Sequence, residues 1–214
     1  YQFKYIKTDT AKPVVEPVAI VVKDTVIPKI EKKSPTLPAI PELTLYFPND
    51  EPNPRSLAST TTENYQTILK RYIAYQQEYI SNYGAENTSL EHFFKQHVTA
   101  KPNEIEQYLT IIEQYLAQGK TLEVTINGFA SPLNKGTYNL NLSKRRIHSF
   151  INILEENNTL QKYIHNKQLV LIQLPEGDTK ANTNVSKELN DLRNSVYSPE
   201  AALERKIHVR TLVK

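Results

Sequence analysis

Residues 121–154 read TLEVTINGFASPLNKGTYNLNLSKRRIHSFINIL, and this stretch decides the fold. Apolar and polar residues alternate in LEVTING at 122–128, which is the period of a strand with one buried face. Apolar residues then recur at helical spacing in LSKRRIHSFINIL at 142–154, behind a loop of small and turn-forming residues. The stretch therefore predicts a strand, a loop and a helix that begins near Asn141.

Three consecutive cations, Lys144, Arg145 and Arg146, lie near the expected start of this helix. A strand-to-helix loop exposes backbone N–H groups at the helix N-terminus, where a carboxylate or a phosphate can bind. At 100° per residue, Arg146 lies a quarter-turn from the centre of the apolar face and leans over the loop. Arg145 points nearly opposite that face, so we expect it to be a solvated surface charge.

The rest of the chain supplies further strands and helices with similar periodicities. We expect a strand at 42–47, a long amphipathic helix at 61–83 ending at Gly84, a helix in SLEHFFKQHV, a helix at 103–119 opened by a capping box of Asn103 and Glu106, and strands at 169–174 and 206–213. An irregular stretch with one or two short helices separates the last two strands. This alternation predicts an α/β (α+β) two-layer sandwich: a small mixed sheet with helices on one face.

Composition limits the domain plan and the function classes. Nine of the 13 prolines precede residue 55, so residues 1–40 are predicted to be an extended linker, either a bare tail or a tether, and 41–214 one domain. The chain starts with Tyr1 and contains no Met, so it reads as a processed or internal fragment. No apolar run is long enough to span a membrane. The net charge of +3 is scattered, which does not favour nucleic acid as a partner.

Catalytic and cofactor signatures are weak. The chain has no Cys, which excludes disulfides, thiolate metal sites and cysteine nucleophiles, and its five histidines show no metal spacing. Ser131 lies in GFASP, which is not a nucleophile elbow, and the five glycines form no phosphate loop. We therefore expect a protein that is not an enzyme and that carries neither a cofactor nor a metal.

The strand, loop and helix resemble the ligand-binding motif of OmpA-like C-terminal domains. That family has a G-x-T-D pattern followed by Y-N-x-x-L-S-x-x-R-A, and the matching residues here are Gly128, Phe129, Ala130, Ser131, Tyr138, Asn139, Leu142, Ser143, Arg146 and Ile147. The closing ALERKIHVRTLV resembles the last strand of the family, with Arg205 and Lys206 in its basic positions. The resemblance covers about 42–213, with apparent insertions at about 60–100 and 175–200. The sequence of these segments is most similar to that of Bacteroidetes-type envelope proteins, including the peptidoglycan-anchoring component of type IX secretion.

The resemblance implies a periplasmic, outer-membrane-associated domain that binds the diaminopimelate of the peptidoglycan stem peptide without catalysis. In the family an Asp accepts from the ligand ammonium and an Arg pairs with its carboxylate; Arg146 takes the second role, and Ser131 stands where the Asp would be. The implied binding residues are Phe129, Ala130, Ser131, Asn139, Leu142 and Arg146.

Because a serine carries no charge, two alternatives follow for this chain. Another carboxylate replaces the family's Asp, with Asp50, Glu51 and Asp191 as candidates. Alternatively, the pocket has lost its ligand, and the domain is a scaffold for outer-membrane or secretion-machinery proteins.

Overall fold

A computed structural model describes residues 36–84, 86 and 88–214 of the chain, and residues 36–214 form one compact unit. Most of the expected linker at 1–40 lies outside the described residues. Residues 36–42 run without helix or strand into the first strand.

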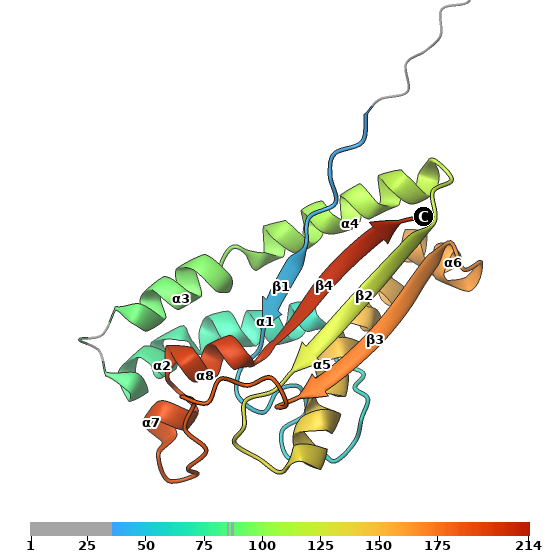
Figure 1. The fold of residues 1–214 in the computed structure, drawn as a ribbon. Coiled ribbons are helices and arrows are strands. Elements are labelled where there is room, and N and C mark those ends of the chain that lie inside the picture. Colours follow the sequence, from blue (N-terminus) through green and yellow to red (C-terminus); the bar gives the residue numbers. More distant parts are fainter. Residues whose placement is uncertain (1–35, 85, 87) are drawn as a thin grey trace, which may run out of the picture. The chain divides into compact units, whose positions relative to one another are not determined.

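Four strands form one mixed sheet in the order β1-β4-β2-β3 (Figure 1). They are β1 (Leu43–Tyr46), β2 (Leu122–Phe129), β3 (Leu169–Gly177) and β4 (Lys206–Val213). β2 pairs in parallel with β3 on one side and antiparallel with β4 on the other, while β1 pairs antiparallel with β4. All four predicted strands are therefore confirmed. The long β2–β4 ladder places the beginning of β4 beside the end of β2, with Gly128 opposite Ile207.

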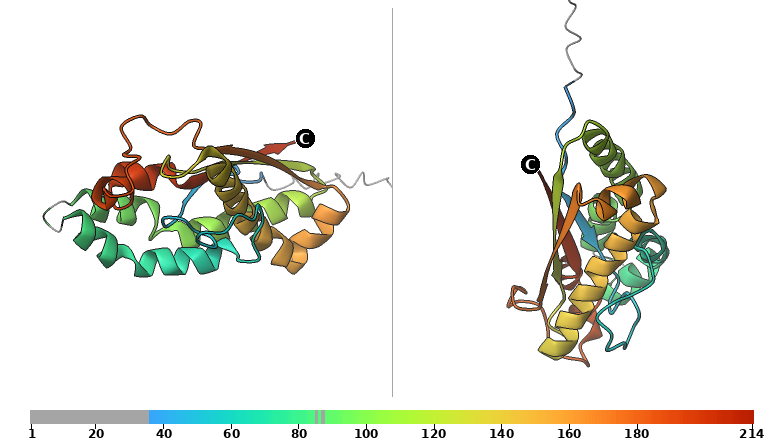
Figure 2. Two further views of the ribbon diagram at one scale, coloured as in Figure 1. Left: turned by 90° about the horizontal axis from the view of Figure 1, so that it is seen from below. Right: turned by 90° about the vertical axis from the view of Figure 1, so that its right-hand side faces the viewer.

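The helices that contact the sheet cover one of its faces, as Figure 2 shows in its right-hand view. They include α4 (Lys101–Ala117), α5 (Gly136–Glu156) and α6 (Asn158–His165); α5 packs on β2, β3 and β4, α4 on β1 and β2, and α6 on β3, while α3 (Ser89–His97) also contacts β1. The alternating burial of β2 explains this, because its Leu, Val and Ile side chains face the helices and its polar side chains face away. The predicted two-layer α/β sandwich is thus confirmed.

The helical region before α4 differs from the expected single long helix. Two helices, α1 (Tyr65–Ala74) and α2 (Gln76–Tyr83), meet at Tyr75, and α3 (Ser89–His97) follows. Gly84 ends α2 with a φ of 129°, as its position predicted. The break lets α2 turn toward α3 and α7 while α1 packs on α5.

The start of the helix expected at 103–119 was also predicted incorrectly. The helix α4 begins at Lys101, with Ala100 at its N-cap and no side-chain cap, so Asn103 lies inside the first turn and forms no capping box. Pro102 in that first turn is the signal that places the start earlier, because proline suits this position. The irregular stretch after β3 contains two short helices, α7 (Leu192–Ser195) and α8 (Pro199–Glu204), as expected.

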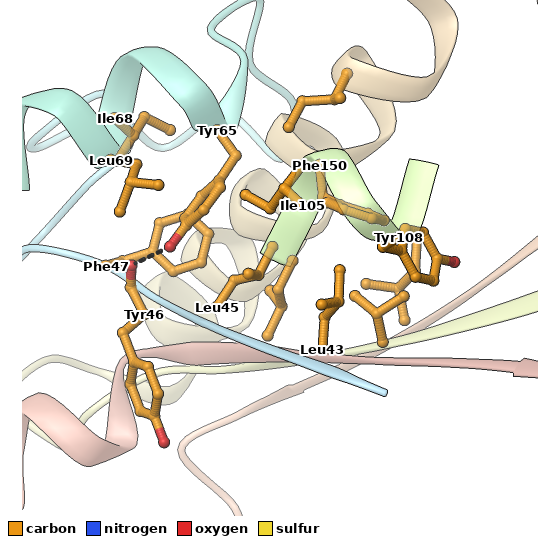
Figure 3. Packing of buried hydrophobic residues seen from close by; sticks show 14 of the residues in the cluster. Leu43, Leu45, Tyr46, Phe47, Tyr65, Ile68, Leu69, Ile105, Tyr108 and Phe150 are labelled. Carbon is orange, nitrogen blue, oxygen red and sulfur yellow. Dashed lines mark hydrogen bonds between the residues drawn. The ribbon is translucent and has the colours of Figure 1, made fainter. Parts of the chain in front are cut away.

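The core lies between the sheet and the helices (Figure 3). Leu43, Leu45 and Phe47 extend from the β1 segment into this layer, where they meet residues of α1, α4 and α5. The Tyr65 hydroxyl donates to the Tyr46 carbonyl at 2.9 Å, so even this polar group is satisfied inside the core. Among the described helices, none is both long and apolar enough to cross a bilayer.

Buried tyrosines make the fold sensitive to alkaline pH. Burial raises the pKa of Tyr65, Tyr72, Tyr79 and Tyr108, in the last case to about 12. An unfolded tyrosine ionises near pH ~10, so above that pH the unfolded chain binds fewer protons and the free energy of unfolding falls. Arg146 acts in the opposite sense, because burial lowers its pKa to about 9. Four tyrosines outweigh one arginine, and the net prediction is a loss of stability above pH ~10.

Tyr72→Phe tests this expectation. The variant should reduce the steepness of the loss by about 1.4 kcal/mol per pH unit between pH ~10 and ~12, because one fewer tyrosine ionises on unfolding. Urea unfolding at pH 9, 10 and 11 measures the slope. Tyr163→Phe, at a half-exposed position on α6, is the matched control. Equal slopes in the wild-type chain and the Tyr72 variant would contradict the prediction.

Candidate ligand-binding site

The helix α5 begins at Gly136, earlier than the expected start near Asn141. Arg146 therefore lies about 15 Å along the helix from its first residue, at 1.5 Å per residue. The cations Lys144, Arg145 and Arg146 are not in the first turn, so they do not share one anion site with the helix N-terminus. The site must be built from side chains and loops around the middle of α5.

Arg146 is fully buried at the end of β2. Its Nε donates to the Glu51 carbonyl at 3.0 Å, and its Nη1 donates to the Phe129 carbonyl at 2.7 Å. The guanidinium carbon lies 5.2 Å from the centre of the Phe47 ring. Its Nη2 is buried and makes no hydrogen bond. Arg146 thus joins the last residue of β2 to the first-strand loop, and one nitrogen of its fork is left for a further acceptor.

The charge of Arg146 is poorly compensated. Burial and then Arg205 lower the pKa of Arg146, and Asp50 raises it in part, with a resulting value of about 9. A cation held in this way gains when an anion approaches, because the anion offsets both the desolvation and the repulsion. The electrostatics of the site thus favour a negatively charged ligand group.

Arg145 was expected to be solvated, and this prediction is wrong: its side chain is fully buried. Its Nε donates to the Pro52 carbonyl at 2.9 Å, and its Nη1 donates to the carbonyls of Ser56 and Ala58 at 2.8 and 2.7 Å. The ring of Tyr138 lies 5.5 Å from its guanidinium carbon. The loop at 50–58 therefore covers the outer face of α5, and Arg145 clamps that loop in place.

The first-strand loop brings two of the candidate carboxylates to this region. Asp50 accepts hydrogen bonds from the Tyr138 hydroxyl and, at 2.9 Å, from the Arg55 backbone N–H. Glu51 contributes its carbonyl to Arg146, while its carboxylate pairs with Arg71 at 2.9 Å. Asp50 is therefore the carboxylate that acts on the charge of Arg146, and Glu51 is a structural support.

Asp191, the third candidate carboxylate, lies at the N-cap of α7. It accepts from the backbone N–H of Asn194 and from its side-chain amide. These hydrogen bonds lower the pKa of Asp191, with the Asn194 side chain as the largest cause. No interaction within the described part of the chain joins it to Arg146. The structure gives Asp191 a capping role.

The remaining residues of the motif lie at the end of β2, in the loop that follows it and in the first turn of α5. The Phe129 carbonyl is used by Arg146, and the Ala130 backbone N–H donates to the Gly177 carbonyl at 2.7 Å. Ser131 is buried in the same loop, 6% exposed. Asn139 is buried and donates to the Asn134 carbonyl at 2.8 Å, which closes the loop. The loop is thus held by hydrogen bonds to β3 and α5.

Leu142 is a buried residue of α5, so its role is packing. Two residues that shape the site, Tyr138 and Arg205, were named in the resemblance but were not predicted as site residues. Tyr138 ties Asp50 to α5, and its presence in the matching pattern was the available signal. Arg205 is fully buried beside Phe47, to whose carbonyl its Nε lies at 3.4 Å. Its position just before a strand gave no indication of burial.

Comparison of the chain with family models, curated proteins and solved structures finds no significant match in any of the three. The site must therefore be judged on its own geometry. It presents one free guanidinium nitrogen, one carboxylate held by a phenol, and a serine, all near the end of β2. Such a pair of opposite charges suits a ligand that carries an ammonium and a carboxylate on one carbon. Within the described residues no His, Asp and Glu side chains are grouped closely enough to hold a metal.

Proposed function

We propose that this domain binds peptidoglycan without catalysis, through the diaminopimelate of the stem peptide, and anchors an outer-membrane or secretion complex to the cell wall in the periplasm. The observation that carries the proposal is the unfilled Nη2 of Arg146, together with the electrostatic interaction between Arg146 and Asp50. The ligand carboxylate would bind the guanidinium. Asp50 would accept from the ligand ammonium, in place of the aspartate that the resemblance predicts where Ser131 stands.

Calorimetric titration with two muropeptides tests the proposal. One contains diaminopimelate, and the other contains lysine, which lacks only the terminal carboxylate. We expect the first to bind at least tenfold more tightly, since a charge-assisted hydrogen bond contributes about 1.5–3 kcal/mol and 1.4 kcal/mol is a factor of ten. Arg146→Lys should remove most of this preference, because an ammonium cannot reproduce the planar fork. Equal affinity for the two muropeptides would exclude diaminopimelate recognition.

Two substitutions distinguish the candidates for the ammonium-binding role. If Asp50 holds that role, Asp50→Asn weakens diaminopimelate binding about tenfold, by the loss of one charge-assisted contact. Ser131→Asp would then add a second carboxylate to an occupied position and bring little gain. A tenfold gain from Ser131→Asp together with no loss from Asp50→Asn would assign the role to position 131 instead.

A second candidate function is a protein-interaction scaffold of a secretion or motility apparatus. The observation that favours it is the complete burial of Arg146, two of whose nitrogens are used by backbone carbonyls. Pull-down with purified sacculi separates the two functions. Retention that free muropeptide competes away supports wall binding, and absence of retention supports the scaffold.

A further inference from the structure

Two fully buried arginines, Arg146 of α5 and Arg205 at the entry to β4, approach the same part of the core; we call them the buried arginine pair. Phe47 is their common neighbour, because Arg146 lies over its ring and Arg205 lies against its carbonyl. Three nitrogens of the pair, Nη2 of Arg146 and both Nη atoms of Arg205, are buried without a hydrogen-bond partner.

The pair lacks a counter-charge in direct contact. None of the ion pairs within the described residues includes Arg146 or Arg205. The carboxylate that acts on Arg146 is Asp50, and it is already bound by Tyr138 and by a backbone N–H. Arg205 is, after burial, the largest cause that lowers the pKa of Arg146, which shows that the two cations repel each other.

The tyrosines around the pair are neutral hydroxyls that can donate. Burial raises the pKa of Tyr72 and Tyr79, so both remain protonated. Tyr79 accepts from the Asn49 backbone N–H at 2.8 Å, which leaves its own proton for another acceptor, and its ring centre is 5.8 Å from the guanidinium carbon of Arg205. Tyr72 interacts with Arg205, which partly offsets the rise of the Tyr72 pKa, although the contact lacks the geometry of a full hydrogen bond. A neutral hydroxyl does not offset the charge of a guanidinium.

Uncompensated buried cations are costly, and their unfilled donors add to the cost. We propose that the buried arginine pair holds a small monovalent anion, a halide or a carboxylate, between Arg146 and Arg205, with Tyr72 as a further donor. The anion would link α5 to the beginning of β4. The proposal goes beyond wall binding, because it adds Arg205 and does not require diaminopimelate. The anion has two possible sources: a free ion from solution, or the carboxylate of the ligand that the proposed function predicts.

The test measures the unfolding midpoint of the 214-residue chain while sodium formate replaces sodium gluconate at constant ionic strength. Gluconate is the bulky reference, because its carboxylate carries a five-carbon polyol. An anion that binds only the folded state raises the midpoint in a saturable way. We expect such a rise in the wild-type chain and its loss in Arg205→Gln. Arg210→Gln, which removes an exposed arginine of β4 that pairs with Glu42, should keep the wild-type response.

If Arg205→Gln does not fold, Tyr72→Phe replaces it in the formate titration. It keeps both cations and removes one donor, so formate should bind several-fold more weakly. No formate dependence in the wild-type chain, or an equal dependence in the wild-type chain and in the Arg205 and Tyr72 variants, would overturn the proposal.

A second arm identifies the source of the anion. If diaminopimelate muropeptide competes with formate, the anion at the arginine pair is the carboxylate of the ligand. If muropeptide and formate bind at the same time, the anion is a free ion from solution. Formate dependence without any muropeptide binding would reject the wall-binding function and keep the anion site. Muropeptide binding without formate dependence would reject the anion site and keep the wall-binding function.

Discussion

Replacing Arg145 by alanine is expected to destabilise the folded chain by about 3 kcal/mol, because a buried acceptor that loses its donor costs about 1–3 kcal/mol and two less buried acceptors lose theirs as well. Three carbonyls of the first-strand loop would lose their donor: the hydrogen bond to Pro52 is buried, and those to Ser56 and Ala58 are partly buried. The substitution would also open a cavity between α5 and the loop. Urea unfolding measures the change in the free energy of unfolding.

Lys144→Ala is the matched control for this substitution. Lys144 is the preceding residue on α5, also a cation, and is half-exposed. A substitution at such a surface position usually changes stability by less than ~0.5 kcal/mol. If both variants lose stability equally, the clamp formed by Arg145 does not contribute as the geometry predicts.

Loss of the clamp has a further consequence for the candidate site. The loop that Arg145 holds begins at Asp50, whose carboxylate interacts electrostatically with Arg146 and is bound by Tyr138. Arg145→Lys keeps the charge, but a single ammonium cannot reach the three carbonyls that the guanidinium fork of Arg145 binds, so the loop would be held less firmly. If Asp50 receives the ligand ammonium, this variant should lose affinity for both muropeptides, because lysine keeps the ammonium and lacks only the terminal carboxylate.

The misplacement of Arg145 shows where sequence reasoning ends. A helical wheel identifies the face that packs on the sheet, and it assigns the opposite face to solvent. Here the loop at 50–58 lies over that opposite face, and its irregular sequence carries no periodicity that predicts where it will lie. Burial of Arg145 depends on this long-range contact. Arg146 was placed correctly because its position relative to the sheet follows from the wheel alone.

The strands and the fold class were predictable because period-two alternation is explicit in each strand, most clearly in β2. Helix boundaries were less predictable. The start of α5 was placed too late because Gly136 and Thr137 read as loop residues, and tertiary packing overrides that weak preference. Among the candidate carboxylates, the choice between Asp50 and Asp191 depends on contacts across the fold, and no local pattern distinguishes them.

Gly128→Ala is expected to destabilise the chain by about 3 kcal/mol, at the upper end for an added methyl group in a packed core. Gly128 lies in β2, so its backbone does not require glycine; the close approach of α5 does. A Cβ at this position would lie 2.6 Å from the Ser143 carbonyl oxygen and 2.8 Å from Cγ1 of Ile147. The backbone oxygen cannot rotate away, so α5 must move from the sheet.

Gly136→Ala is the matched control, because a Cβ there meets no atom within 4 Å and alanine favours a helix by up to ~1 kcal/mol over glycine. Thermal and urea unfolding of the two variants should therefore change in opposite directions. Similar changes would show that the Gly128 contact is absorbed by small adjustments.

The contact at Gly128 also sets the position of Arg146. Phe129, whose carbonyl accepts from Arg146, directly follows Gly128 in β2. Ile147, which packs against Gly128, directly follows Arg146 in α5. Any movement that separates Gly128 from α5 therefore lengthens the hydrogen bond between Arg146 and Phe129 before it disturbs the rest of the core. A Gly128→Ala chain that still folds should show weaker muropeptide or formate binding, whereas Gly136→Ala should bind as the wild-type chain does. The glycine of the motif thus acts on the site through the distance between a strand and a helix.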